Sequence, residues 1–413
     1  MSTEYRNNHY VPVWYQKRFL LPGQRDNELY NLNLAPTTVR DSTGHAHTMN
    51  AVRRLGPKHC FTEKDLYTTR FGSEESTKVE QAFFGSIDSK GRKAVEYFTS
   101  FAHPSVNTDA FTDMMIYLST QKLRTPKGLG RLNSQVKTSD QNMVLGFMME
   151  IQQIHCAIWT ECVWQIADAS ESETKFLISD HPVTVYNRRC GPRSMWCHGF
   201  DDPNIALQGS HTIFPLSLEK ILFLTNLSWV RNPYQSEMAV RPNPNPWRTA
   251  IFNFMDIQTM RHLSEQEVRE VNFILKSRAL RYVAAAKEEW LYPENHVSKS
   301  DWNTFGHGYL LMPDPRPINL GGEIFIGYTG GGSSAFDAYG RRPWQPDYDR
   351  ESKGLIEGPS LDKFKGEFAR LFGPYRRGRS FSHGDMDKER DSDDFHEYHL
   401  SLETKKRKPR NSS

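Results

Sequence analysis

A histidine, three carboxylates and two arginines in this sequence could together carry out metal-assisted hydrolysis of a phosphodiester. That reaction needs a general base, oxygen ligands for a divalent cation, and positive charges that bind the phosphate. The candidates, in chain order, are His9, Arg18, Glu80, Asp88, Arg124 and Asp180. We assign the catalytic roles to His9 and Asp180, with His9 as the general base or as a metal ligand. Because these residues lie far apart in the sequence, only the fold could bring them together.

The carboxylates of Glu80, Asp88 and Asp180 are the predicted metal ligands. Divalent cations such as Mg²⁺ bind carboxylate oxygens, so a divalent metal ion is the cofactor that fits this set, although its identity is open. Glu80 and Asp88 lie on one expected helix, two turns apart and on roughly the same side. That separation is too large for them to share one ion directly, but each carboxylate could face a common cleft.

A second group of polar residues suggests that the site binds an anion. The predicted binding residues are Tyr10, Arg18, Gln121 and Arg124. Pro12 favours the start of a short helix soon after Tyr10, and the free N–H groups of a helix N-terminus attract anions. Gln121 and Arg124 are three residues apart, so one face of a helix can present both. The partners that this chemistry favours are nucleic acid or a phosphorylated small molecule.

The same residues also have a purely structural interpretation. His9 and Tyr10 could bond to loop carbonyl groups. Glu80 could pair with Arg124, and Asp180 could cap a turn. Buried polar residues more often satisfy partners than catalyse a reaction, so we weigh this interpretation above the catalytic one.

Three functions stay open on the sequence alone. The first is a metal-dependent hydrolase that acts on nucleic acid or a nucleotide, in a host-defence or toxin setting. The second is a non-catalytic module that binds an anion, a nucleic acid or a peptide, and the third is a nucleotide-dependent transferase. A hydrolase needs the carboxylates around Glu80 and at Asp180 to converge on His9. A binding module needs only the cations and the aromatic rings.

Four potential zinc ligands occur within one short segment. They are His181, Cys190, Cys197 and His198. Their spacing lacks the paired Cys-x-x-Cys form that is typical of structural zinc sites. Ordinary buried thiols and surface imidazoles are therefore the better interpretation.

The elements that would position these residues follow from hydrophobic periodicity. Helices are expected over residues 12–20, 76–98, 108–122, 142–169 and 264–290. Strands are expected over residues 28–34, 176–180, 183–186, 214–217, 221–225, 308–312 and 323–328. Ser264 and Glu267 predict a capping box at the start of the last helix. Because helices come first and strands later, we predict an α+β fold in which a helical layer packs on a mixed or antiparallel sheet.

Several of these residues belong to a pattern that resembles a known family. The pattern is Asn8-His9-Tyr10-Val11-Pro12 with Tyr15 and Phe19, then Glu80 and Asp88, Gln121 with Arg124-Thr125-Pro126, Ser179-Asp180 with Pro182, and Phe214-Pro215-Leu216-Ser217. It resembles the family called domain of unknown function 4238 over roughly residues 5–285. Asp88 stands where that family pattern has Glu, and His181 where Asn is usual. The resemblance implies no activity, because none is assigned to the family.

The chain is expected to divide into three parts. Residues 1–290 are the predicted family-like α+β domain, residues 291–375 a C-terminal extension packed on it, and residues 376–413 a disordered charged tail. The tail contains the basic cluster Lys405-Lys406-Arg407-Lys408. Such a cluster would be a nuclear address if the source is eukaryotic.

Composition excludes several classes of protein. The 413 residues carry a formal net charge of +3, so the chain is not a polycation that would coat nucleic acid or a membrane. The mean hydropathy is −0.67, and no apolar run approaches the ~20 residues that span a bilayer. Five cysteines, an odd number, argue against a disulfide framework and fit a reducing compartment. We therefore expect a soluble cytoplasmic protein with no membrane partner.

Overall fold

The computed structural model describes most of the chain between residues 7 and 373. The described residues are 7–40, 45–64, 66, 69–71, 74–76, 84–101, 107–136, 141–241, 257–305, 310–318, 324–327, 330–336, 342–345, 348 and 351–373. Glu80 and the predicted tail 376–413 lie outside the described residues, as does the basic cluster 405–408.

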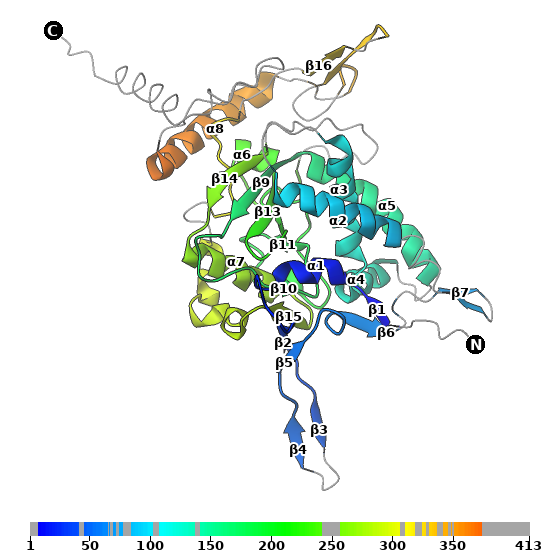
Figure 1. The fold of residues 1–413 in the computed structure, drawn as a ribbon. Coiled ribbons are helices and arrows are strands. Elements are labelled where there is room, and N and C mark those ends of the chain that lie inside the picture. The colour runs from blue at the N-terminus through cyan, green and yellow to red at the C-terminus, as the bar shows by residue number, and fades with distance from the viewer. Residues whose placement is uncertain are drawn as a thin grey trace, which may run out of the picture.

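A five-stranded mixed sheet forms the centre of the fold (Figure 1). Its strands, in spatial order, are β11 (Thr184–Tyr186), β12 (His211–Pro215), β13 (Lys220–Asn226), β9 (Cys162–Asp168) and β14 (Gln258–His262). Strand β14 runs parallel to β9, and the other neighbouring pairs are antiparallel. Strand β9 is buried from Cys162 to Ala167, so the sheet is covered on both faces at its centre.

A second, four-stranded sheet is wholly antiparallel. Its strands, in spatial order, are β10 (Ile178–Ser179), β15 (Tyr282–Ala285), β2 (Leu29–Asn33) and β5 (Val52–Leu55). In this register Ser179 lies opposite Val283, and Val283 lies opposite Leu32. The sheet therefore places Asp180, the residue after β10, beside the first residues of β15.

A layer of four helices packs against one face of the five-stranded sheet (Figure 1). The helices are α2 (Gly85–Thr99), α3 (Thr108–Leu123), α4 (Pro126–Val136) and α5 (Gln141–Thr160). The ring of Trp164 on β9 lies 5.4 Å from the ring of Phe98 on α2 and 4.4 Å from that of Phe111 on α3. Such aromatic contacts between a central strand and its helices fix how the layers sit on one another.

The neighbouring residue of β9, Val163, points to a separate apolar cluster. Because successive side chains of a strand point to opposite faces, Val163 and Trp164 contact different layers. The cluster joins β9 to helices α6 (Leu227–Arg231) and α8 (Glu351–Phe372). Its buried members are Val163, Trp229, Val230, Met312, Ile318, Leu361, Phe364 and Phe368. The C-terminal helix is thus held by burial of its own apolar face.

The first helical segment anchors the chain on the central sheet. Helix α1 (Val13–Gln16) follows Pro12 and continues as a 3-10 turn over Lys17–Phe19, as the sequence predicts. The Tyr15 ring stacks on Phe214 with a centroid distance of 5.2 Å, and its hydroxyl donates to the Pro215 carbonyl oxygen at 2.6 Å. The N-terminal motif therefore has a clear packing role.

The remaining described elements are pairs of short strands, helix α7 and several 3-10 turns. They are β1 (Asn7–His9) paired with β6 (Thr62–Lys64), β3 (Thr38–Arg40) with β4 (Ala46–Thr48), β7 (Thr69–Phe71) with β8 (Glu74–Ser76), β16 (Ile324–Gly327) with β17 (Ser333–Phe336), helix α7 (Glu265–Arg278), and 3-10 turns at Met195–Cys197, Glu288–Leu291, Pro293–Asn295 and Lys299–Thr304. The β3–β4 hairpin projects from the body of the molecule (Figure 1). The predicted α+β class, with a mixed sheet and a helical layer, is confirmed.

Two predicted helices end earlier than expected, and each is followed by a strand. The helix predicted over 142–169 ends at Thr160, and β9 begins at Cys162. The helix that begins at the capping box of Ser264 and Glu267 ends at Arg278, and β15 follows. The spacing of apolar residues fits a helix and a fully buried strand equally well over such short runs. The strand predicted over 308–312 is also wrong in its described part, since residues 310–311 form a turn.

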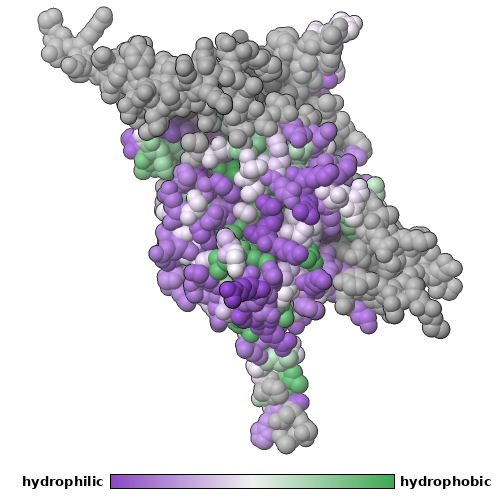
Figure 2. All heavy atoms as spheres, viewed as in Figure 1, coloured by the Kyte–Doolittle hydropathy of each residue, from purple (hydrophilic) through white to green (hydrophobic). Residues whose placement is uncertain are grey.

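The residues coloured by hydropathy in Figure 2 are mostly hydrophilic, and hydrophobic residues appear among them only in small areas. Among the described helices, none has the length and the apolar character needed to cross a membrane.

Two buried histidines predict how the stability of the fold depends on pH. Burial lowers the pKa of His181 to about 4 and that of His211 to about 3, below the value of about 6.5 expected in the unfolded chain. Between these values the unfolded chain binds protons that the folded chain does not, so stability falls as the pH is lowered. The expected slope is up to about 1.4 kcal/mol per pH unit for each histidine.

Urea unfolding at pH 7, 6 and 5 measures this dependence. The variant His211→Gln should reduce the slope, because it removes one of the histidines whose pKa is lowered by burial. A free energy of unfolding that stays constant or rises from pH 7 to pH 5 would contradict the prediction.

Candidate functional site

Asp180 uses its carboxylate to bind the backbone at the start of β15. Its Oδ1 accepts a hydrogen bond from the N–H of Leu280 at 2.8 Å, and its Oδ2 accepts from the N–H groups of Arg281 at 2.6 Å and Tyr282 at 2.8 Å. Burial raises the pKa of Asp180, while the three hydrogen bonds act to lower it. An extended segment leaves these N–H groups free for a side chain, which a continuing helix would not. The contact therefore explains why the predicted helix stops before this segment.

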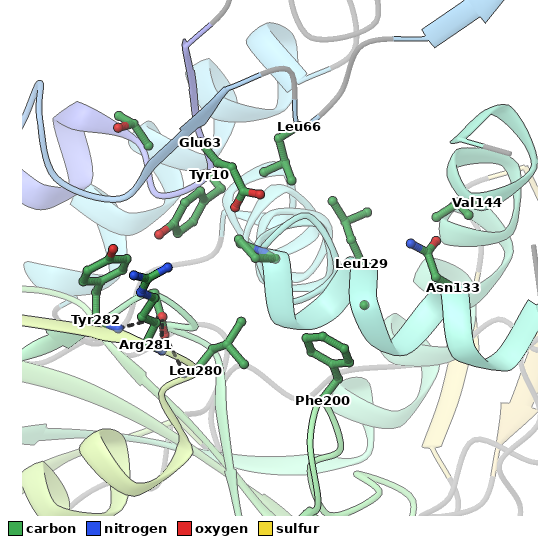
Figure 3. Close-up of a pocket in the computed structure, with 14 residues that line it drawn as sticks. Tyr10, Glu63, Leu66, Leu129, Asn133, Val144, Phe200, Leu280, Arg281 and Tyr282 are labelled. Atoms are coloured by element: carbon green, nitrogen blue, oxygen red, sulfur yellow. Dashed lines mark hydrogen bonds between the residues drawn. The ribbon is translucent and has the colours of Figure 1, made fainter. Parts of the chain in front are cut away.

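The segment held by Asp180 forms one wall of a cavity of about 610 Å³ (Figure 3). The lining residues include Tyr10, Glu63, Leu129, Phe200 and Arg281. In Figure 3 the side chains of Arg281, Tyr10 and Glu63 lie on one side of this space and those of Phe200 and Leu129 on the other. We call it the Arg281 cavity. It thus has one polar, charged side and one apolar side.

The charged side carries a cation beside aromatic rings. The side chain of Arg281 is exposed, and its guanidinium lies 5.2 Å from the centroid of the Tyr282 ring. Partial burial raises the pKa of the Glu63 carboxyl, and the positive charge of Arg281 acts in the opposite direction. A second cavity of about 340 Å³ also has Arg281 and Tyr282 in its lining, together with Arg53. Arg281 therefore stands where the two cavities adjoin.

The sequence-predicted catalytic His9 has a backbone partner. Its Nε2 donates to the carbonyl oxygen of Lys58 at 3.0 Å, and burial lowers its pKa. Arg18, a predicted binding residue, also bonds within the protein. Its Nε donates to the Leu216 carbonyl oxygen at 2.7 Å, and a terminal nitrogen donates to Thr99 Oγ1 at 2.6 Å. Both side chains connect segments that are distant in the sequence.

Gln121, Arg124 and Asp88 form a buried chain of contacts that reaches the backbone of Tyr10. Gln121 Nε2 donates to the Tyr10 carbonyl oxygen at 2.8 Å, and Gln121 Oε1 accepts from Arg124 Nε at 2.9 Å. Arg124 also pairs with Asp88 at 2.8 Å and lies over the ring of Phe84. The predicted pair of Arg124 with Glu80 falls on a residue outside the described part of the chain. This chain of contacts therefore supports the backbone of Tyr10, which lines the Arg281 cavity.

A second buried carboxylate, Asp202, joins two lysines and a histidine. Its oxygens lie 2.9 Å from Lys122 Nζ, 2.6 Å from Lys127 Nζ and 2.9 Å from His181 Nε2. We call these four residues the Asp202 cluster. The two ammonium groups hold the pKa of Asp202 well below its usual range, although burial acts to raise it. Burial lowers the pKa of Lys122 to about 8.

The structure separates the other predicted ligand sets. His181 belongs to the Asp202 cluster, whereas Cys190 and Cys197 lie beside each other in the following loop. In the part of the chain that the structure describes, no three His, Cys, Asp or Glu side chains converge as metal ligands would. Asp180 and Tyr10 are the sequence-predicted site residues that line the Arg281 cavity.

Sequence reasoning missed the residues that give the cavity its chemistry. Arg281 falls inside the helix predicted over 264–290, where the sequence pattern suggests only a cation on the surface. Glu63 and Phe200 lie in segments without a periodic signal. The one signal in the sequence that could have pointed to this cavity is Asp180. It is a carboxylate that directly follows an apolar strand, so its hydrogen-bond donors had to come from another segment of the chain.

Comparison with known proteins identifies a family but no characterised relative. The family model described as protein of unknown function (DUF4238) matches residues 7–289 of the chain. The predicted resemblance is thereby confirmed, with nearly the same limits. Neither the curated proteins nor the solved structures gave a match.

Replacing Asp180 by Asn tests its role as a backbone anchor. The amide has a single acceptor oxygen, and its NH₂ group would face N–H donors, so at least one hydrogen bond is lost. We expect Asp180→Asn to lower the free energy of unfolding by about 1–3 kcal/mol in urea at pH 7. The control Asp201→Asn, at an exposed carboxylate, should change it by less than about 0.5 kcal/mol. Equal effects of the two substitutions would contradict the anchor.

The Asp202 cluster predicts a larger loss. Asp202→Asn leaves the buried ammonium groups of Lys122 and Lys127 without an anion, which should cost about 3–5 kcal/mol. The control Glu96→Gln breaks the exposed pair with Arg92 and should cost at most about 0.5 kcal/mol. Urea unfolding measures both, and a cost below about 1 kcal/mol for Asp202→Asn would refute the charge argument.

Proposed function

The chain belongs to the DUF4238 family, whose description assigns no activity, and we propose that it binds a small anionic molecule in the Arg281 cavity. The observation that carries this proposal is the guanidinium of Arg281, which faces a cavity whose opposite side is apolar (Figure 3). A guanidinium offers paired N–H donors that match the oxygens of a phosphate or a carboxylate. The ligand would therefore place its anionic group on Arg281.

The size and the lining of the cavity support a small organic ligand. Its volume of about 610 Å³ lies within the range of ~300–1,000 Å³ that is usual for small-molecule sites. Phe200, Leu129 and Val144 offer apolar surface for the body of a ligand, and Asn133 offers a polar group at the same end. A phosphorylated molecule that carries a planar ring, such as a nucleotide, fits this division.

Binding accounts for the charged groups better than hydrolysis does. A hydrolase would need carboxylates that converge on His9, but of the predicted carboxylates that the structure describes, Asp180 binds three backbone N–H groups and Asp88 pairs with Arg124. His9 donates to the backbone of Lys58. The binding proposal needs none of these side chains to leave its partner. For the same reason we favour it over a nucleotide-dependent transferase.

Substitution of Arg281 tests this proposal. Nucleoside 5′-monophosphates are the probes, and calorimetry measures their affinity for the full chain. Arg281→Ala should weaken binding roughly tenfold or more, because a hydrogen bond to a charged group contributes about 1.5–3 kcal/mol. The control Arg92→Ala, which removes an exposed arginine on α2, should leave the affinity unchanged.

A second variant separates the two sides of the cavity. Phe200→Ala should weaken binding of the nucleotides but not of inorganic phosphate, which lacks the ring. Binding of every probe with the same affinity by the parent and by Arg281→Ala would overturn the proposal, as would no binding at all by the parent.

A further inference from the structure

Two cysteines meet in the loop that follows β11. Cys190 ends a turn in which its N–H donates to the Asn187 carbonyl oxygen at 2.9 Å. The chain then folds back twice, with N–H to carbonyl bonds of 3.0 Å from Ser194 to Gly191 and from Cys197 to Ser194. These turns bring Cys197 Sγ to 4.0 Å from the Cys190 carbonyl oxygen. We call residues 190–197 the two-cysteine loop.

The groups around Cys197 stabilise a thiolate. The Cys190 side chain contacts Met238 Sδ at 3.9 Å, and the Cys197 sulfur faces the Cys190 carbonyl oxygen. Arg278 donates to the Cys190 carbonyl oxygen and places its positive charge beside both sulfurs. The interaction with Cys190 is the main cause that lowers the pKa of Cys197, and the charge of Arg278 adds to it, while burial and the negative charge of Asp202 act in the opposite direction.

The other cysteines of the chain lie in different surroundings. Burial raises the pKa of Cys60 and of Cys156 to about 12, and it raises that of Cys162 further. Reactive cysteines have a stabilised thiolate and some access to solvent, whereas buried apolar cysteines are inert. Cys197 is half-buried, and its neighbours Met195 and Trp196 are 82% and 54% exposed. A small reagent can therefore approach the two-cysteine loop.

We propose that Cys197 is a reactive thiol and Cys190 its resolving partner, so that a peroxide converts the pair into a disulfide. In the first step the Cys197 thiolate attacks one peroxide oxygen, the O–O bond breaks, and the departing hydroxide takes up a proton to become water. Cys197 becomes a sulfenic acid. In the second step the Cys190 sulfur attacks the Cys197 sulfur, the S–O bond breaks, and a second water leaves with the Cys190 proton.

The two steps together balance in atoms and electrons. Two thiols lose two electrons and two protons in total, one S–S bond forms, and one hydrogen peroxide becomes two waters. A thiol reductant reverses it by exchange. The inference does not depend on the ligand of the Arg281 cavity, because no residue of that cavity takes part in the step.

Peptide mass spectrometry of the full chain tests the reactivity first. The five cysteines are alkylated with iodoacetamide at pH 7 under reducing conditions, and labelling is followed over time. Cys197 should react at least roughly tenfold faster than Cys156, which is also partly accessible but lacks a stabilised thiolate. Equal rates at these two residues would overturn the proposal.

Treatment with hydrogen peroxide then tests the pairing. The parent should lose about 2 Da and yield a linked Cys190–Cys197 peptide that a thiol reductant separates. The variant Cys190→Ser should instead hold a sulfenic acid at Cys197 that dimedone traps, and the control Cys156→Ser should form the disulfide as the parent does. If peroxide leaves both thiols of the parent open to alkylation, or links Cys197 to a different cysteine, the proposal is wrong.

Discussion

One buried carboxylate, Asp202, fixes the relative positions of the segments that build the cavity walls. It binds the ammonium groups of Lys122, at the end of α3, and of Lys127, at the start of α4. Lys127 also donates to the Arg278 carbonyl oxygen at the end of α7, at 2.7 Å. Charges buried in this way must be compensated, so these contacts leave little freedom for movement. The helix α4 that carries one wall of the Arg281 cavity is thereby tied to the chain just before β15, which carries the other.

The second carboxylate, Asp180, has a different and complementary role. It binds only backbone N–H groups, and the segment that it holds begins just after Arg278, where Lys127 is bound. The carboxylate therefore takes the backbone N–H of Arg281, while the guanidinium extends into the cavity (Figure 3). A carboxylate that satisfies backbone donors can orient a cation without neutralising it. Because the Asp180 carboxylate binds backbone N–H groups, the guanidinium of Arg281 can face the proposed ligand site although an acidic residue lies nearby.

Local signals in the sequence were enough for the elements that depend on nearby residues. The capping box of Ser264 and Glu267 and the short helix after Pro12 could both be predicted, because their hydrogen bonds and backbone preferences lie within a few residues. The end of α7 could not, because it depends on Asp180, which lies 101 residues before Arg281. The start of β9 at Cys162 was missed for another reason, since a strand buried on both faces has no alternating pattern.

The same reasoning explains why the sequence pointed to only some of the residues around the Arg281 cavity. A residue type reveals which chemistry is available, but burial decides whether a side chain acts on a ligand or on the protein itself. His9 and Arg124 carry reactive groups, yet each bonds to neighbouring parts of the fold. Arg281 and Cys197 carry no recognisable motif, yet one faces a cavity and the other has groups around it that stabilise a negative charge. Our two proposals therefore rest on the surroundings that the fold gives Arg281 and Cys197, and not on a sequence motif.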